Sequence, residues 1–358
     1  MKKLKVLIYL LFLSLLLQAC TAINATVNAV GRNITSLFSS PRQIDRKIFN
    51  PYRPDARLAV LWIGHASVLI QIDDKFILTD PVLTGTVGQF SRRLVEPGIE
   101  TENIPVIDVL LISHLHIDHY SPASIAMLGK KIKKMLIPQG AFVYVPNFDI
   151  DIDELPQGMH WEKEGLRITA VPVIHNGWRY GLDEAWMTTS YTGYLVDYNG
   201  IRVYIGGDTA YDSLLFKETG RRYPAIDLAV LPVAPIHPRE YSRARHTDPA
   251  EALQITEDLG AACLLPMHYD TFPESIDTLG EAVTLLRQEI KRRQIDPARV
   301  IIPDIGELRI IIKKHPEQFA TPSLPPSDLP GRFPIRHKDK IYSGKEPPLH
   351  INSSERNF

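Results

Sequence analysis

The chain has 358 residues, 44% of them hydrophobic, so it is long enough to bury a large core as one big domain or two. Its 40 Lys and Arg balance 41 Asp and Glu, which gives a formal net charge of −1. A dedicated nucleic-acid-binding protein normally carries a basic face, so no nucleic-acid partner is expected, although a local basic patch stays open.

The amino terminus has the pattern of a secretory signal. Three lysines within the first five residues precede the apolar run Val6–Leu17, which is short for a membrane span. The segment Leu17–Cys20 resembles a bacterial lipobox, in which the cysteine is lipidated. We therefore expect a signal peptide at residues 1–19 and a lipidated tether at residues 20–54. An ordinary signal peptide or an uncleaved anchor is the alternative.

A lipidated Cys20 predicts a protein of the cell envelope that meets the membrane through its lipid. Thr21 after the cysteine resembles lipoproteins sent to the outer membrane, on the periplasmic side, provided that the source is Gram-negative. Cys263 is the other cysteine, so no disulfide framework is expected. It lies in an apolar run, which predicts a small buried side chain rather than a nucleophile or ligand.

The folded part opens with short apolar strands at residues 58–63, 67–72 and 75–78, the last two joined by a tight turn. Asp80 follows the third strand, and Pro81 prevents that strand from continuing. Residues 84–103 form a long loop, a candidate lid over a site. We expect Arg92 and Arg93 in this loop to be solvated, with contact to an anion as the alternative.

The most informative stretch comes next. The apolar, β-branched run 107–112 predicts a buried strand. Directly after it come three histidines and a carboxylate within six positions: His114, His116, Asp118 and His119. Two histidines two residues apart can grip one cation from an extended segment, and imidazole and carboxylate are the usual non-thiol ligands of zinc. A polar loop with scattered histidines is the alternative, and the density of ligand-type residues argues against it.

The chain then predicts a helix over residues 122–128, with Ser121 as its N-cap and Pro122 in its first position. The basic run 130–134 is expected at the surface, as a solvated helix end or as a contact for anionic lipid. A strand at residues 135–138 follows.

Three later strands each deliver a ligand-type residue at their end. The strand 166–173 leads to His175, and the hairpin 194–205, with its Asn199-Gly200 turn, leads to Gly206-Gly207 and Asp208. The strand 262–267 leads to His268. His246 precedes a helix that begins after Asp248, the expected N-cap, and ends near Leu259.

The remaining segments frame this pattern. The loop after His175 carries aromatic and basic side chains that suit a ligand wall or ordinary packing: Trp178, Arg179, Tyr180 and Trp186. A helix at residues 279–293 and strands at 300–303 and 308–312 complete the domain. The Pro-rich residues 315–358 are expected to form an irregular tail.

These motifs carry a family resemblance. The motif His114–His119 resembles the H-x-H-x-D-H signature of the metallo-β-lactamase fold hydrolases, and the resemblance extends from about Leu58 to about Ile311. Four further segments are similar to the branch that contains N-acyl-phosphatidylethanolamine phospholipase D: Trp62–Ser67, Leu78–Pro81, Gly206–Thr209 and His246–Pro249. The resemblance implies an α/β fold over residues 55–314, the αββα sandwich of two mixed sheets flanked by helices.

The resemblance also implies roles for single residues. It implies that one metal ion is bound by His114, His116 and His175. It implies that a second ion is bound by Asp118, His119 and His268, with Asp208 bridging the two. Asp80 is expected to support the metal loop, for which a turn-capping Asp is the equal alternative. His65 is expected behind the ligands or near the substrate, and His246 is expected to face the active site.

The leading hypothesis is a hydrolase with two metal ions, in which Asp118 and His246 take part in catalysis. Zinc is expected because the ligands are nitrogen and oxygen, although manganese or iron would also fit. Two such metal ions lower the pKa of the water bound to them toward about 7. The resemblance implies phosphodiester hydrolysis, with a phospholipid head group as one candidate substrate. The alternatives are a lactone or amide hydrolase with the same metal site and a non-catalytic metal-binding lipoprotein.

Overall fold

The computed structural model describes residues 27–314, apart from residues 29, 89–90, 182, 184–188 and 274. The expected signal peptide, Cys20, Trp186 and the Pro-rich tail lie outside these described residues. Within the described part of the chain, no helix combines the length and the apolar character that crossing a bilayer requires.

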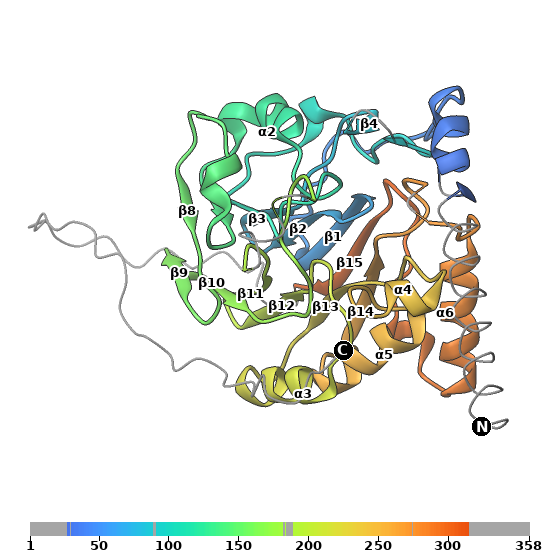
Figure 1. The fold of residues 1–358 in the computed structure, drawn as a ribbon. Coiled ribbons are helices and arrows are strands. Elements are labelled where there is room, and N and C mark those ends of the chain that lie inside the picture. Colours follow the sequence, from blue (N-terminus) through green and yellow to red (C-terminus); the bar gives the residue numbers. More distant parts are fainter. Residues whose placement is uncertain are drawn as a thin grey trace, which may run out of the picture.

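Two mixed β-sheets lie face to face at the centre of the fold (Figure 1). The first sheet has the order β15-β1-β2-β3-β6-β7-β8. Its strands are β15 (Leu308–Lys313), β1 (Ala56–Gly64), β2 (Ser67–Ile72), β3 (Lys75–Thr79), β6 (Val109–Leu111), β7 (Met135–Ile137) and β8 (Ile152–Glu154). The second sheet has the order β14-β13-β12-β11-β10-β9. Its strands are β14 (Cys263–Met267), β13 (Leu228–Pro232), β12 (Ile201–Ile205), β11 (Gly193–Tyr198), β10 (Leu166–Val171) and β9 (His160–Lys163).

Alternation of side chains along the strands separates two hydrophobic clusters. In β1, Val60 and Trp62 join the large cluster that also contains the residues of the second sheet. Their neighbours Leu61 and Ile63 point to the opposite face and pack in a second cluster together with residues of α2 (Pro122–Leu128). The central strands of the first sheet are therefore buried on both faces, which explains the uninterrupted apolar runs Leu58–Ile63 in β1 and Val109–Leu111 in β6.

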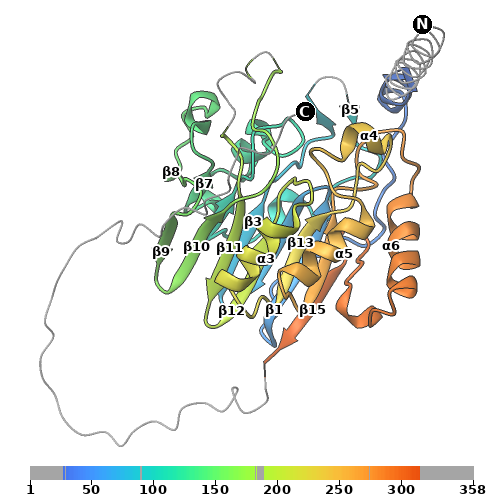
Figure 2. The ribbon, with the colours of Figure 1, turned by 60° about the horizontal axis from the view of Figure 1, so that its bottom comes forward.

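The helices form the outer layers. Figure 2 shows α3 (Ser213–Arg222) and α5 (Pro249–Asp258) in front of the second sheet, and α6 (Glu281–Arg292) packs beside α5. The expected αββα sandwich is confirmed. Shorter elements are α4 (Arg239–Ser242), the strand pair β4 (Thr86–Val87) and β5 (Ser91–Arg92), and the 3-10 turns η1 (Thr101–Asn103), η2 (Gly129–Lys131), η3 (Ala141–Tyr144) and η4 (Pro297–Arg299).

Local signals in the sequence act as expected at several ends. The side chain of Ser121 caps α2, and that of Asp248 caps α5 by accepting the N–H of Glu251 at 2.9 Å. Asn199 and Gly200 have φ of 51° and 76°, the left-handed pair that a tight hairpin requires. The strand expected at residues 300–303 is wrong: Val300 forms only an isolated bridge with Leu264, and Pro303 cannot donate a ladder hydrogen bond.

Three side chains lie in surroundings other than those expected. Lys134 is buried because β7 carries it against the edge strand β8, where Asp151 and Asp153 pair with its ammonium at 2.8 and 2.5 Å. Arg93 is also buried rather than solvated. Its guanidinium lies over the ring of Phe272, and burial lowers its pKa to about 10. Cys263 is half-buried rather than fully buried.

Candidate metal centre

The candidate ligands meet at one edge of the sandwich because every one of them follows a strand that ends there. β3 and β6 are parallel neighbours, so the residues that follow them, Asp80 and the loop with His114, lie at the same edge of the sheet. In the second sheet β12, β13 and β14 are parallel, which brings Asp208 and His268 to the same edge. The family resemblance implied this convergence, and the position of each ligand-type residue after a strand agrees with it.

Four donor groups form the first half of the centre. His114, His116, His175 and Asp208 each offer a ligand atom within 4.8 Å of the others. Nδ1 of His116 lies 2.9 Å from Nε2 of His114 and 3.3 Å from Nε2 of His175. The outer nitrogen of His175 lies 3.0 Å from the carbonyl oxygen of Arg245 and donates to it, which fixes the tautomer whose free nitrogen faces the cluster.

The second half joins the metal loop to the last strand. His65, Asp118, His119 and His268 offer ligand atoms within 4.8 Å of one another. Nε2 of His268 lies 3.1 Å from Nε2 of His119 and 3.4 Å from the Asp118 carboxylate. Nε2 of His65 lies 3.0 Å from the same carboxylate, closer to it than either of the other histidines. His65 therefore belongs to this group by distance, as a fourth donor or as the partner that orients Asp118.

Asp208 lies between the two halves. Its Oδ2 is 3.4 Å from Nε2 of His119 and 3.7 Å from Nε2 of His175, and its Oδ1 is 3.2 Å from Nε2 of His268. Both carboxylate oxygens are buried, and neither accepts a hydrogen bond from the described residues. A buried carboxylate with free oxygens is costly unless a cation balances it, so this orphaned group fits a bridging metal ligand.

The glycine before Asp208 allows this position. Gly207 has a φ of 57°, and a Cβ there would lie 2.5 Å from Cβ of Ser113 in the metal loop. The backbone that carries Asp208 therefore lies directly against the loop that carries His114, a contact that only glycine permits.

Asp80 supports the metal loop from behind, in line with the role that the family resemblance implies. Its carboxylate accepts the backbone N–H of Ser113 at 2.7 Å and the Ser113 hydroxyl at 2.6 Å, and it contacts Nδ1 of His119 at 2.8 Å. Since the carboxylate accepts from Nδ1 of His119, Nε2 is the nitrogen of that ring left to bind an ion, on the side of Asp208 and His268. Asp80 is in none of the donor groups that could hold an ion.

Some of the backbone strain of the described fold lies at this centre. Three non-glycine residues of the site, His65, Asp80 and His268, have left-handed φ of 55°, 37° and 69°. Such conformations are unfavourable for side chains of this kind and persist where the surroundings fix them.

His246 occupies a separate position at the rim. Its Nδ1 lies 3.3 Å from Oδ2 of Asp208, and its ring lies edge-to-face with that of His175 and tilted to that of His268, at centroid distances of 5.3 and 5.6 Å. It shares a third donor group with Asp208 and His268. The structure thus brings His246 to the active-site edge, where it could bind an ion or contact a substrate.

The sequence left a ligand wall and ordinary packing open for the side chains after His175, and in the structure Arg179 and Trp178 pack against the metal loop. Arg179 Nη1 donates to the carbonyl oxygens of Leu115 and Tyr120 at 2.8 and 2.7 Å, so it holds the metal loop rather than facing a ligand. Trp178 packs against His116 with ring centroids 4.3 Å apart. The roles of Arg179 and of Ser113 were missed because sequence patterns do not reveal which backbone carbonyls or carboxylates a side chain will reach.

The protonation states of several side chains at the centre suit cation binding. Burial lowers the pKa of His65, His175 and His246 to about 3 each, and that of His116 to about 4, so these rings are neutral at pH 7. Burial alone would raise the pKa of Asp208, but the surrounding histidines, His268 first, hold it well below its usual range. Neutral imidazoles and ionised carboxylates are the forms that bind divalent metals.

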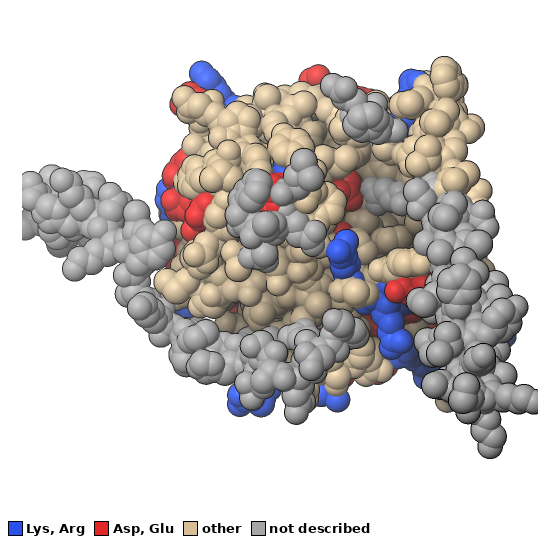
Figure 3. Space-filling model, viewed as in Figure 1, with Lys and Arg blue, Asp and Glu red and all other residues tan. Residues whose placement is uncertain are grey.

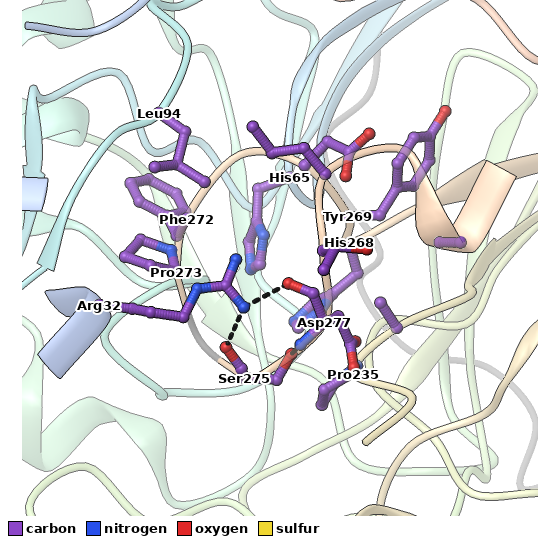
Figure 4. A pocket seen from close by; sticks show the side chains of 15 residues that line it. Arg32, His65, Leu94, Pro235, His268, Tyr269, Phe272, Pro273, Ser275 and Asp277 are labelled. Atoms are coloured by element: carbon purple, nitrogen blue, oxygen red, sulfur yellow. Dashed lines mark hydrogen bonds between the residues drawn. The ribbon is translucent and has the colours of Figure 1, made fainter. Parts of the chain in front are cut away.

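A narrow pocket of about 30 Å³ adjoins the second half of the centre (Figure 4). His65 and His268 form its inner end. The rest of its lining mixes apolar side chains with polar ones: Leu94, Pro235, Phe272 and Leu279 beside Arg32, Asp270 and Asp277. Arg32 reaches it from the helix before β1 and donates to the carbonyl oxygen of Ser275 at 3.0 Å (Figure 4).

Comparison with known proteins places this geometry in a family. Residues 75–269 match the β-lactamase superfamily domain. The chain is 30% identical over 255 residues to an uncharacterized protein of Mycobacterium tuberculosis, covering 66% of this chain and 65% of that protein. It is also 30% identical over 255 residues to a UPF0173 metal-dependent hydrolase of Pyrococcus horikoshii, covering 69% of this chain and 97% of the relative. The chain thus spans less than two thirds of the mycobacterial relative.

Two further likenesses extend this picture. The chain is 28% identical over 270 residues to an N-acyl-phosphatidylethanolamine-hydrolyzing phospholipase D of Caenorhabditis elegans, covering 71% of this chain and 74% of that protein. The fold is similar to that of a metallo hydrolase from Ignicoccus hospitalis, with a TM-score of 0.52, 21% identity, and coverage of 70% of this chain and 97% of the other. With its two converging donor groups, the chain belongs to the metallo-β-lactamase superfamily of metal-dependent hydrolases.

Proposed function

We propose that this hydrolase cleaves phosphodiesters, with phospholipids of the N-acylated type as the leading substrate class. The observation that carries the proposal is the likeness to the phospholipase D of C. elegans over 71% of this chain. The donor groups of this chain, which bring together every expected ligand, support it. A site that had lost its catalysis would be expected to lack a ligand, and none is missing here.

The donor set favours two divalent ions of the zinc type, because it offers imidazole and carboxylate without thiolate. His114, His116 and His175 would hold one ion, and Asp118, His119 and His268 the other, with Asp208 between them. When bound, such a pair supplies Lewis acidity and an activated water at neutral pH.

The residues of the chain do the remaining work. Oδ2 of Asp118 accepts a hydrogen bond from Nε2 of His65, which leaves the other carboxylate oxygen of Asp118 to orient an attacking water toward phosphorus. His246 is neutral at pH 7, because burial lowers its pKa to about 3. It would therefore donate a hydrogen bond to a phosphoryl oxygen rather than act as a cation. Arg179 keeps the loop of His114–His119 in register while charge develops on the substrate.

A substrate panel tests the proposal. The full chain in detergent micelles is loaded with zinc and given bis-p-nitrophenyl phosphate, N-acyl-phosphatidylethanolamine in mixed micelles, a lactone and nitrocefin. We expect turnover of the two phosphodiesters. Asp118→Asn should lower kcat/KM by about 100-fold or more, and His246→Gln by about 10-fold or more. The matched control is His160→Gln, in the strand β9 away from the centre.

Each outcome of this panel decides something. Turnover of the lactone or nitrocefin without either phosphodiester would overturn the substrate assignment in favour of the acyl-transfer alternative. Zinc binding without turnover of any substrate would favour the non-catalytic lipoprotein. Equal losses in Asp118→Asn and His160→Gln would show that the centre described above is not the site of the reaction.

We also propose that the chain is tethered to the cell envelope through lipidated Cys20. The support is the sequence pattern of residues 1–20 alone. Metabolic labelling of the full chain with a fatty acid should mark the native protein but not Cys20→Ser, and a label that persists in Cys20→Ser would refute the tether.

A further inference from the structure

Residues 30–37 are helical, and their apolar side chains point away from the protein. The exposed fractions along this segment are 63% for Val27, 52% for Val30, 54% for Ile34, 37% for Leu37 and 86% for Phe38. The spacing of three and four residues places these side chains on one stripe, about 100° wide. Figure 3 shows this corner of the molecule, at the upper right, as largely uncharged.

The polar side of the same helix makes the contacts with the domain. Arg32 donates to the carbonyl oxygens of Ser275 and Asp277, and Asn33 donates to that of Pro273 at 2.8 Å. Ser36 is buried. The helix is therefore inverted, since a surface helix in water normally buries its apolar stripe and exposes its polar side. A row of five exposed apolar side chains marks a contact surface rather than chance exposure.

We propose that this apolar stripe, Val27 to Phe38, lies in the interface of a lipid bilayer. The chain that leads into the helix points to lipid as the occupant. The apolar run Val6–Leu17 ends ten residues before Val27, and Cys20 lies seven residues before it. Seven residues span at most about 25 Å. A membrane-attached residue at either place therefore holds the helix at the bilayer, where an apolar stripe is favourable.

The stripe also orients the candidate site. The helix is attached through Arg32 to the loop 275–279, and that loop lines the pocket beside His65 and His268 (Figure 4). Leu279 belongs to the pocket wall and is 63% exposed, so this loop also presents an apolar side chain to the surroundings. If the proposed phospholipid substrate is correct, on which this consequence rests, Leu279 offers a contact for its acyl part beside the pocket.

Lipid contact can be measured without any enzymatic turnover. The full chain is reconstituted in phosphatidylcholine vesicles with either ordinary or dibrominated acyl chains, and tryptophan is introduced as Phe38→Trp or Ile34→Trp. Bromine quenches only tryptophans that reach the acyl region. We expect quenching of the introduced tryptophan at least twice that of the matched control Leu214→Trp, because Leu214 is 81% exposed on α3, at the opposite end of the fold.

Two results would overturn the proposal. One is quenching of the introduced tryptophans that is no greater than in the Leu214→Trp control. The other is a second copy of the chain as the occupant. In that case Phe38→Cys would form a disulfide-linked dimer in vesicles at high dilution of protein in lipid, while Phe38→Trp would be shielded from bromine.

A second measurement separates this surface from the proposed function. In Ile34→Ser with Phe38→Ser, we expect turnover of vesicle-embedded phospholipid to fall at least tenfold, while turnover of bis-p-nitrophenyl phosphate stays within twofold. The control pair is Met127→Ser with Leu214→Ser, two exposed apolar residues elsewhere. Equal losses on both substrates would contradict a surface role. If neither substrate is turned over by the unmodified chain, the proposed function fails and the quenching result still decides the bilayer contact.

Discussion

Replacing Asp80 by Asn changes one oxygen into an amide group without changing the shape of the side chain. Asn tolerates the left-handed φ of 37° at this position, so the backbone should be retained. In the unmodified protein, the Asp80 carboxylate accepts hydrogen bonds from three donor groups at 2.6–2.8 Å, two on Ser113 and one on His119. The asparagine oxygen can still accept one of them, while its NH₂ faces groups that need an acceptor.

The size of the effect follows from these contacts. A buried hydrogen bond to a charged group contributes about 1.5–3 kcal/mol, so losing two of them would cost about 3–6 kcal/mol. The Ser113 hydroxyl can rotate and recover one, which leaves an expected loss of about 1.5–3 kcal/mol in the unfolding free energy of the metal-free protein. His119 would also change tautomer, placing its proton on Nε2, where the ligand lone pair is needed. Loss of such an outer partner lowers metal affinity or activity by about 10–100-fold.

Zinc affinity by competition with a chromophoric chelator, together with urea unfolding after chelation, checks both numbers. The matched control is Asp212→Asn, which removes an N-cap carboxylate that accepts the N–H of Leu215 at 2.9 Å on α3, away from the centre. Because Asn caps a helix about as well as Asp, the control should lose little stability and no zinc affinity. An Asp80→Asn protein with unchanged zinc affinity would refute the reasoning that Asp80 fixes the tautomer of His119.

Three further predictions concern the same edge of the fold. Gly207→Ala should lose about 1–3 kcal/mol more in urea unfolding than Gly200→Ala, because both have positive φ but only the first would clash, at 2.5 Å, with Ser113; equal losses would contradict the close approach. Arg179→Met should lower kcat/KM about tenfold or more with the fold retained by circular dichroism, whereas Arg167→Met, an exposed control, should not. The free energy of unfolding of the chelated protein should fall as the pH drops below about 6.5, because the unfolded chain then binds more protons than the folded one. The loss is at most about 1.4 kcal/mol per pH unit for each histidine whose pKa is lowered by burial. A flat profile between pH 7.5 and 5 would contradict the buried neutral state of His65, His116, His175 and His246. His119 acts in the opposite sense above about pH 6.5, because carboxylates outweigh its burial and raise its pKa.

The layered fold and the position of the centre could be predicted from the sequence because both depend on local signals. The buried strand before His114, the Asn199-Gly200 turn and the helix caps at Ser121 and Asp248 each act over a few residues. Parallel strands then bring their ends to one edge, whatever lies between them in the sequence.

The errors share a different cause. Lys134 is buried because Asp151 and Asp153 pair with its ammonium. Arg93 is buried because the carbonyl oxygens of Val82 and Val95 and the ring of Phe272 surround its guanidinium. Of these partners only Val95 lies within a short sequence window of its side chain. The helix at residues 30–37 escaped notice for a related reason, since its apolar stripe faces outward and so does not mark a core face.

The two donor groups draw on both halves of the chain, from His65 to His268, and so connect one sheet of the sandwich with the other. A protein whose second cysteine has no thiol partner in the described fold cannot use a disulfide for this purpose. Ions bound at this edge would serve as its covalent-like cross-link, closing a loop of some two hundred residues that chain entropy otherwise opposes. Metal binding would then stabilise the packing of the two sheets against each other, in addition to any part in catalysis.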